Sequence, residues 1–115
     1  MKNFKKLEVW KKSMSLAKEI YFLAKFLPKE ERYGLYSQIT RSAVSIPSNI
    51  AEGSAKSTEK EYKRYLEIAL GSAFELETQL LLIQSLQIIN KDIEQTIDQT
   101  CEVQKMLQGL IRKLI

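Results

Sequence analysis

The stretch that decides the fold is Gln38–Gly53, with the sequence QITRSAVSIPSNIAEG. Its apolar residues recur at helical spacing and form one face, which holds Ile39, Ala43, Ile46 and Ile50. Its polar residues recur in steps of three and four along a neighbouring face, which holds Gln38, Arg41, Ser45, Ser48 and Glu52. An ordinary surface helix carries long charged residues on its polar side, whereas this stretch places Ser, Asn, Pro and single opposite charges there, so we expect this face to pack closely against another element.

Pro47 lies inside this helical pattern. A proline cannot donate the backbone hydrogen bond that would reach the Ala43 carbonyl, so we predict a helix that is kinked near Pro47. The residues from Pro28 to Glu31 have the composition of a first helical turn, with an early proline and acidic residues. Gly53 suits the left-handed position that stops many helices, so the helix should end near Glu52.

Helical patterns also flank this stretch. The segment before it should end near Leu27, because Pro28 follows, and its apolar seam holds Leu7, Trp10, Met14, Ala17, Tyr21 and Ala24. After a connection at residues 54–57, Thr58 and Glu61 have the spacing of a capping box. The apolar seam of the helix that follows holds Tyr62, Leu66, Ala69, Ala73, Leu76, Leu80 and Ile83. Asn90 is expected to cap a last helix, whose inner face holds Ile93, Ile97, Cys101, Leu107, Ile111 and Leu114.

A second apolar stripe on the third helix consists of Leu70, Phe74 and Leu81. Gly71 and Ser72 form a small-residue notch beside it, where another backbone could come close. Because one packed face would need only the first seam, the second stripe predicts a homo-oligomer. Residues 1–115 show no strand pattern, so we predict one all-α domain, an antiparallel up-down-up-down four-helix bundle.

Charge is distributed unevenly along the 115 residues, whose net charge is +4. Residues 1–28 carry seven lysines against two glutamates, a net charge of +5, and residues 57–89 have a net charge of −2. Lys11, Lys18 and Lys25 repeat every seven residues on one face of the first helix. This row is either a solvated face or an anion-binding surface that could contact RNA.

The sequence also bears on the compartment. Cys101 is the only cysteine, so the chain cannot form an internal disulfide and suits a reducing compartment. The N-terminal residues lack the apolar run of a signal peptide, and no window has the length of a membrane span. We therefore expect a cytoplasmic protein without a membrane partner.

Catalytic motifs are missing. With no histidine, the chain lacks His-dependent triads, most catalytic zinc sites and di-iron ligation, and it has no phosphate-binding glycine loop. We therefore expect no metal, no cofactor and no enzyme activity. Glu52, Glu75 and Glu77 could converge as an acid pair or bind a cation, but an ion pair with Arg41 is favoured. From the helix register we predict an Arg41–Glu75 pair, within one subunit or between subunits.

Three stretches carry a family resemblance: residues 10–21 (WKKSMSLAKEIY), 35–53 (LYSQITRSAVSIPSNIAEG) and 65–80 (YLEIALGSAFELETQL). They resemble the four-helix-bundle family whose founding members are encoded within intervening sequences of bacterial 23S ribosomal RNA genes. The resemblance covers nearly the whole chain. It carries over a set of signature positions, which comprises Arg41, Ser45, Pro47, Asn49, Glu52, Gly53, Gly71 and Glu75.

The resemblance implies a ring-shaped homopentamer in a bacterial cytoplasm. It leaves two function classes open. One is a non-catalytic protein that associates with ribosomal RNA, or serves as a scaffold, through the lysine row multiplied by the symmetry of the oligomer. The other is a ring that binds a small molecule or a protein at its polar seam on the second and third helices.

Overall fold

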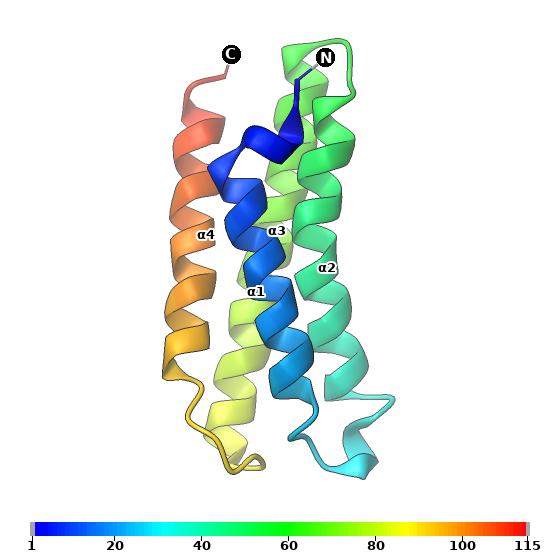
Figure 1. Cartoon of the computed structure of the whole chain (residues 1–115), viewed down its shortest axis with the longest axis vertical. Helices are drawn as coiled ribbons and strands as arrows, with labels where there is room; N and C mark the ends of the chain where they lie inside the picture. Colours follow the sequence, from blue (N-terminus) through cyan, green and yellow to red (C-terminus); the bar gives the residue numbers. More distant parts are fainter. Residues whose placement is uncertain (1, 115) are drawn as a thin grey trace.

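Four long helices make up the computed structural model, which describes residues 2–114 (Figure 1). They are α1 (Glu8–Ala24), α2 (Leu35–Ser54), α3 (Glu59–Leu86) and α4 (Glu94–Arg112). Two short 3₁₀ turns precede α1 and α2, namely η1 (Phe4–Lys6) and η2 (Lys29–Glu31). No strand occurs within residues 2–114, so the all-α prediction is confirmed.

The helices lie side by side along the long axis of a body measuring 44 × 23 × 19 Å (Figure 1). The chain runs down α1, up α2, down α3 and up α4, so both ends of the described chain lie at the same end of the bundle. Helix α2 packs against α1 and α3, and α4 packs against the same two helices. Each apolar face is thereby buried against two neighbours.

The apolar faces predicted for α2 and α3 form the core. The four apolar residues of the opening stretch are fully buried, and so is the whole first seam of α3 from Tyr62 to Ile83, with no member more than 2% exposed. Burying one Leu or Ile side chain contributes about 1.5–3 kcal/mol. Of the second α3 stripe, Leu70 is half-buried against the core, whereas Phe74 and Leu81 are exposed.

The predicted seam of α1 is partly wrong. Met14 and Tyr21 are exposed, and Trp10 is only half-buried. The core is instead reached by a parallel seam, which consists of Val9, Ser13, Leu16, Ile20 and Leu23. Ser13 lies in the core because its hydroxyl donates to the Trp10 carbonyl oxygen at 2.8 Å, and this polar residue hides the seam from a search for apolar spacing.

The face predicted for α4 also needs correction. Cys101, Ile111 and Leu114 are half-buried, whereas Thr96, Thr100, Val103 and Gln104 are buried. Asn90 does not cap the helix. The Asp92 carboxylate accepts from the Glu94 amide at 3.0 Å where α4 begins.

Helix boundaries follow the caps. Thr58 accepts from the Glu61 amide at 3.1 Å, which confirms the predicted cap of α3. Pro28 and the acids after it form the separate turn η2, and α2 begins at Leu35, whose amide donates to the Glu31 carboxylate at 3.1 Å. Helix α2 is continuous through Pro47, and the kink there stays a prediction.

Gly53 does not end α2 in a left-handed conformation. It lies inside the helix, and no glycine among residues 2–114 has a positive φ. Gln87, with a φ of 54°, ends α3 in that way instead. The structure gives Gly53 a different role, described with the seam below.

Candidate functional site

The polar seam between α2 and α3 consists of side chains that bond to one another. The Ser45 and Ser72 hydroxyl oxygens are 2.8 Å apart and share a hydrogen bond. One turn earlier on α2, the Ser42 hydroxyl donates to Glu75 Oε1 at 3.0 Å. Beyond it, Gln79 Nε2 is 3.4 Å from Gln38 Oε1. The three pairs follow one another at helical spacing, since residues 45, 42 and 38 of α2 face residues 72, 75 and 79 of antiparallel α3. Where both partners are serines, the short side chains let the two helices come close.

Asn49 and Gly53 continue this seam. The Asn49 side-chain amide donates to the Ser45 carbonyl oxygen at 2.8 Å and lies 3.0 Å from its hydroxyl. At Gly53, a Cβ atom would lie 2.7 Å from the Cβ of Tyr65, so only glycine allows this approach of α3. The signature residues Ser45 and Gly53 therefore bring α2 against α3, and Asn49 bonds to Ser45 within α2. Ser42 and Gln79 belong to the same contact and were not predicted, whereas Ser72 was predicted only as part of the small-residue notch.

Arg41 does not form the predicted ion pair with Glu75 inside one chain. Its side chain is exposed, and the ion pairs found within residues 2–114 are Lys11–Glu8 and Lys12–Glu102. Arg41 and Glu75 do border one polar depression of about 400 Å³, but Ser42 is the partner of Glu75 there. Gly71 is also exposed, on the outer side of α3. A pairing of Arg41 with Glu75 of another copy stays a prediction.

The three glutamates considered as an acid pair do not converge. Glu75 bonds to α2, whereas Glu77 accepts from Gln104 Nε2 of α4 at 2.8 Å. Glu52 is exposed on α2. Within residues 2–114 no three His, Cys, Asp or Glu side chains are placed to hold a metal ion.

Glu77 also contacts the Cys101 thiol and affects its pKa. Burial raises the pKa of Cys101, and the thiol's hydrogen bond to Glu77 Oε2 at 3.5 Å and the charge of that carboxylate raise it further. A raised pKa keeps the thiol protonated near neutral pH and makes it a poor nucleophile. Cys101 is therefore a packing residue between α3 and α4.

The lysine row of α1 is exposed to solvent. Lys11 lies 3.6 Å from Glu8, and both side chains are mostly exposed, so this pair contributes little. Lys18 and Lys25 have no ion pair with any described residue. The row is therefore accessible along most of its length.

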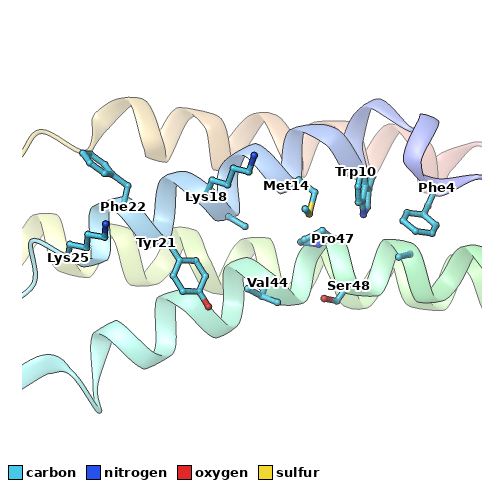
Figure 2. Close-up of a pocket in the computed structure, with 12 residues that line it drawn as sticks. Phe4, Trp10, Met14, Lys18, Tyr21, Phe22, Lys25, Val44, Pro47 and Ser48 are labelled. Carbon is cyan, nitrogen blue, oxygen red and sulfur yellow. The ribbon is translucent and has the colours of Figure 1, made fainter.

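An apolar groove of about 660 Å³ runs between α1 and α2 beside this row (Figure 2). Figure 2 shows Trp10, Met14 and Tyr21 pointing from α1 toward α2, and Lys18 pointing away from it. Val44 and Pro47 line the α2 side, and Phe4 packs edge-on against Trp10 with ring centroids 5.2 Å apart. Trp10, Met14 and Tyr21, which the spacing assigned to the core, thus line this groove instead.

The apolar pattern of α1 could have predicted an exposed apolar groove. Val9, Leu16, Ile20 and Leu23 form a second complete seam on α1, and only one of two such seams can face the core. None of the helices in residues 2–114 combines the length and apolar character that crossing a bilayer requires.

Comparisons with known proteins agree with the resemblance. The model of a family described as "23S rRNA-intervening sequence protein" matches residues 5–109. The crystal structure of a protein of unknown function, from the S23 ribosomal protein family of Bacteroides thetaiotaomicron, is similar with a TM-score of 0.79 and 34% sequence identity. That match covers 90% of this chain and 97% of the other. No curated protein matches the chain.

Proposed function

Because the chain belongs to the 23S rRNA-intervening sequence protein family, we propose that it is a non-catalytic homo-oligomer that associates with RNA through the lysines of α1. The observation that carries this proposal is the exposed row of Lys11, Lys18 and Lys25, of which the last two have no ion pair with a described residue. Lys5 and Lys6 add exposed positive charge next to the start of α1.

RNA binding of this kind depends on assembly. Each lysine that neutralises a phosphate releases counterions, and three such contacts from one copy give weak binding at physiological salt. A closed ring repeats the row once per subunit and multiplies the number of contacts. Five subunits in a bacterial cytoplasm is the arrangement that the family resemblance implies.

The absence of catalysis is part of the proposal. It is supported by the hydrogen bonds of two α3 carboxylates, since Glu75 accepts from Ser42 and Glu77 accepts from Gln104 and Cys101. These acids contribute to helix contacts rather than lining a shared cleft.

The alternative class, a scaffold that binds a ligand at the polar seam, has less support. Ser42, Ser45, Ser72 and Asn49 already bond to neighbours within the chain. A ligand would have to replace these bonds, and a displaced group left without a partner costs about 1–3 kcal/mol.

Filter binding to structured RNA tests the RNA proposal. The variant carries Lys11→Gln, Lys18→Gln and Lys25→Gln, and we expect it to lose the retention that the wild type shows at low salt. A matched control carries Lys60→Gln, Lys63→Gln and Lys105→Gln, which remove the same charge elsewhere and should keep retention. Light scattering on both variants checks that the assembly is unchanged. If wild type is not retained even at low salt, or if the first variant binds equally well, RNA has no place in the function.

A further inference from the structure

We propose that the groove between α1 and α2 is a binding site for a single-chain amphiphile, a long-chain carboxylate whose tail lies along the groove. The head group of this ligand would bind to the lysines of α1. The groove has a volume of about 660 Å³. Small-molecule sites enclose about 300–1,000 Å³, are lined by apolar side chains with a few polar groups, and often form between the helices of bundles.

The apolar lining of the groove faces solvent in a single copy. Tyr21, Phe22 and Val44 are 40–48% exposed, and Met14 is 37% exposed. The hydroxyl groups of Tyr21 and Ser48 are among the few polar groups of the lining. A contiguous apolar surface of this kind is typical of a binding groove.

The groove is long and narrow. Figure 2 shows Trp10 toward one end and Lys25 at the other, and the 15 residues between these positions span about 22 Å along α1. Averaged over that length, the cross-section is about 30 Å², whereas a helix about 10–12 Å wide needs about 80–110 Å². One acyl chain spans about 15 Å, half of the hydrocarbon core of a bilayer. An extended chain and its head group therefore fit in the groove, and a partner helix does not.

The charged residues of the lining are all cationic. Lys18 and Lys25 line the groove, and no acidic side chain among residues 2–114 does so. Neither lysine has an ion pair with a described residue. Lys91 adds positive charge at the Lys25 end, since its Nζ lies 5.1 Å from the centroid of the Phe22 ring. A lysine ammonium on its flexible stem can turn toward a carboxylate at the rim.

The two ends of the groove therefore differ in character. Phe4 packs edge-on against Trp10 at the end away from Lys25 (Figure 2). Positive charge extends from Lys18, near the middle, to Lys25 at the opposite end. A molecule with one apolar tail and one anionic head matches this arrangement, and an uncharged hydrocarbon would leave both lysines without a partner.

Trp10 is an intrinsic reporter for the site, because it is the only tryptophan of the chain and it lines the groove. The test titrates hexadecanoate, below its micelle concentration, into the wild-type protein, and light scattering follows the assembly in the same samples. We expect a saturable blue shift of the tryptophan emission. Shortening the chain should weaken binding about two- to fourfold per CH₂, with the larger factor for full burial.

Brominated chains test the orientation of the ligand. Octadecanoate brominated near the end of its tail should quench Trp10 strongly. Octadecanoate brominated next to the carboxylate should quench it weakly, because the head group lies toward Lys25. Equal or reversed quenching overturns the proposed arrangement.

Two double variants and a matched control test the residues. The groove variant, Met14→Glu with Val44→Glu, should lose binding. The control, Ile68→Glu with Leu82→Glu, changes similarly exposed residues of α3 outside the groove and should keep it. All four side chains are at least 37% exposed, so the core is untouched. Lys18→Gln with Lys25→Gln should weaken hexadecanoate binding about two- to thirtyfold and leave hexadecanol binding unchanged.

The other outcomes each decide against the site. An unchanged Trp10 emission in the wild type overturns it, whether the groove stays empty or another copy covers it. Quenching by vesicles of brominated phosphatidylglycerol, without binding of monomeric hexadecanoate, identifies the occupant as a membrane surface and also overturns it. A failure of RNA binding leaves the site intact, since none of these measurements contains RNA.

Discussion

Replacing Gly53 by alanine probes the closest approach of α2 and α3. The new Cβ would lie 2.7 Å from the Cβ of Tyr65 and 3.3 Å from a ring carbon of Tyr62. An ordinary contact between carbon atoms is about 3.5–4.0 Å, so the helices would have to separate by about 1 Å. Overpacking of this kind costs about 1–3 kcal/mol, and the higher helix propensity of alanine returns about 1 kcal/mol. We therefore expect Gly53→Ala to lower the free energy of unfolding by up to about 2 kcal/mol.

Gly109→Ala is the matched control, because a Cβ there would meet nothing within 4 Å. It should raise the free energy of unfolding by up to about 1 kcal/mol through helix propensity alone. The difference between the two variants isolates the steric cost, about 1–3 kcal/mol. Urea unfolding at one protein concentration measures it, and each kcal/mol corresponds to about 4 °C in melting temperature. If Gly53→Ala is as stable as Gly109→Ala, the tight packing at this seam is refuted.

Three further substitutions test other parts of the account. Thr58→Ala removes the cap of α3 and should cost about 1 kcal/mol in urea unfolding; no loss would show that the cap is dispensable. Arg41→Ala should change stability by less than about 0.5 kcal/mol, since the side chain is exposed and unpaired among the described residues, and a loss of several kcal/mol would contradict this. Glu77→Gln removes a charge that raises the pKa of Cys101, so iodoacetamide should label the thiol faster at mildly alkaline pH, and an unchanged rate would remove Glu77 as a cause.

The sequence was most informative where a helix has one apolar seam. On α3 the seam from Tyr62 to Ile83 is unbroken in steps of three and four, and all seven residues are buried. The core face of α2 was predicted equally well. The exposed pair Phe74 and Leu81 was recognised as lying outside that seam, because its spacing places it on another side of the helix.

Periodicity could not decide between two seams on one helix. On α1 the spacing of Trp10, Met14 and Tyr21 is as regular as that of Leu16, Ile20 and Leu23. Which seam faces inward depends on the positions of α2 and α4, and those positions come from tertiary packing. The groove is the direct result of this choice.

The hydrogen-bond partners between α2 and α3 could not be predicted from spacing either. The register between α2 and α3 depends on where the intervening turn begins, and α2 extends through Gly53 to Ser54 rather than ending before it. The shifted register pairs Ser42, and not Arg41, with Glu75. Gly53 itself was predicted to be special, but its reason is the contact with Tyr65 rather than a left-handed turn.

The salt dependence of RNA binding tests the central claim most directly. On single-stranded RNA, the three row lysines of one copy give a slope of log affinity against log salt of at most about −2, since each contact adds about −0.7. A homo-oligomer that presents several rows to one RNA predicts a slope steeper than that, and it predicts no retention of the variant with Lys11, Lys18 and Lys25 changed to Gln. No binding at low salt, or a wild-type slope that the variant retains, would contradict the account.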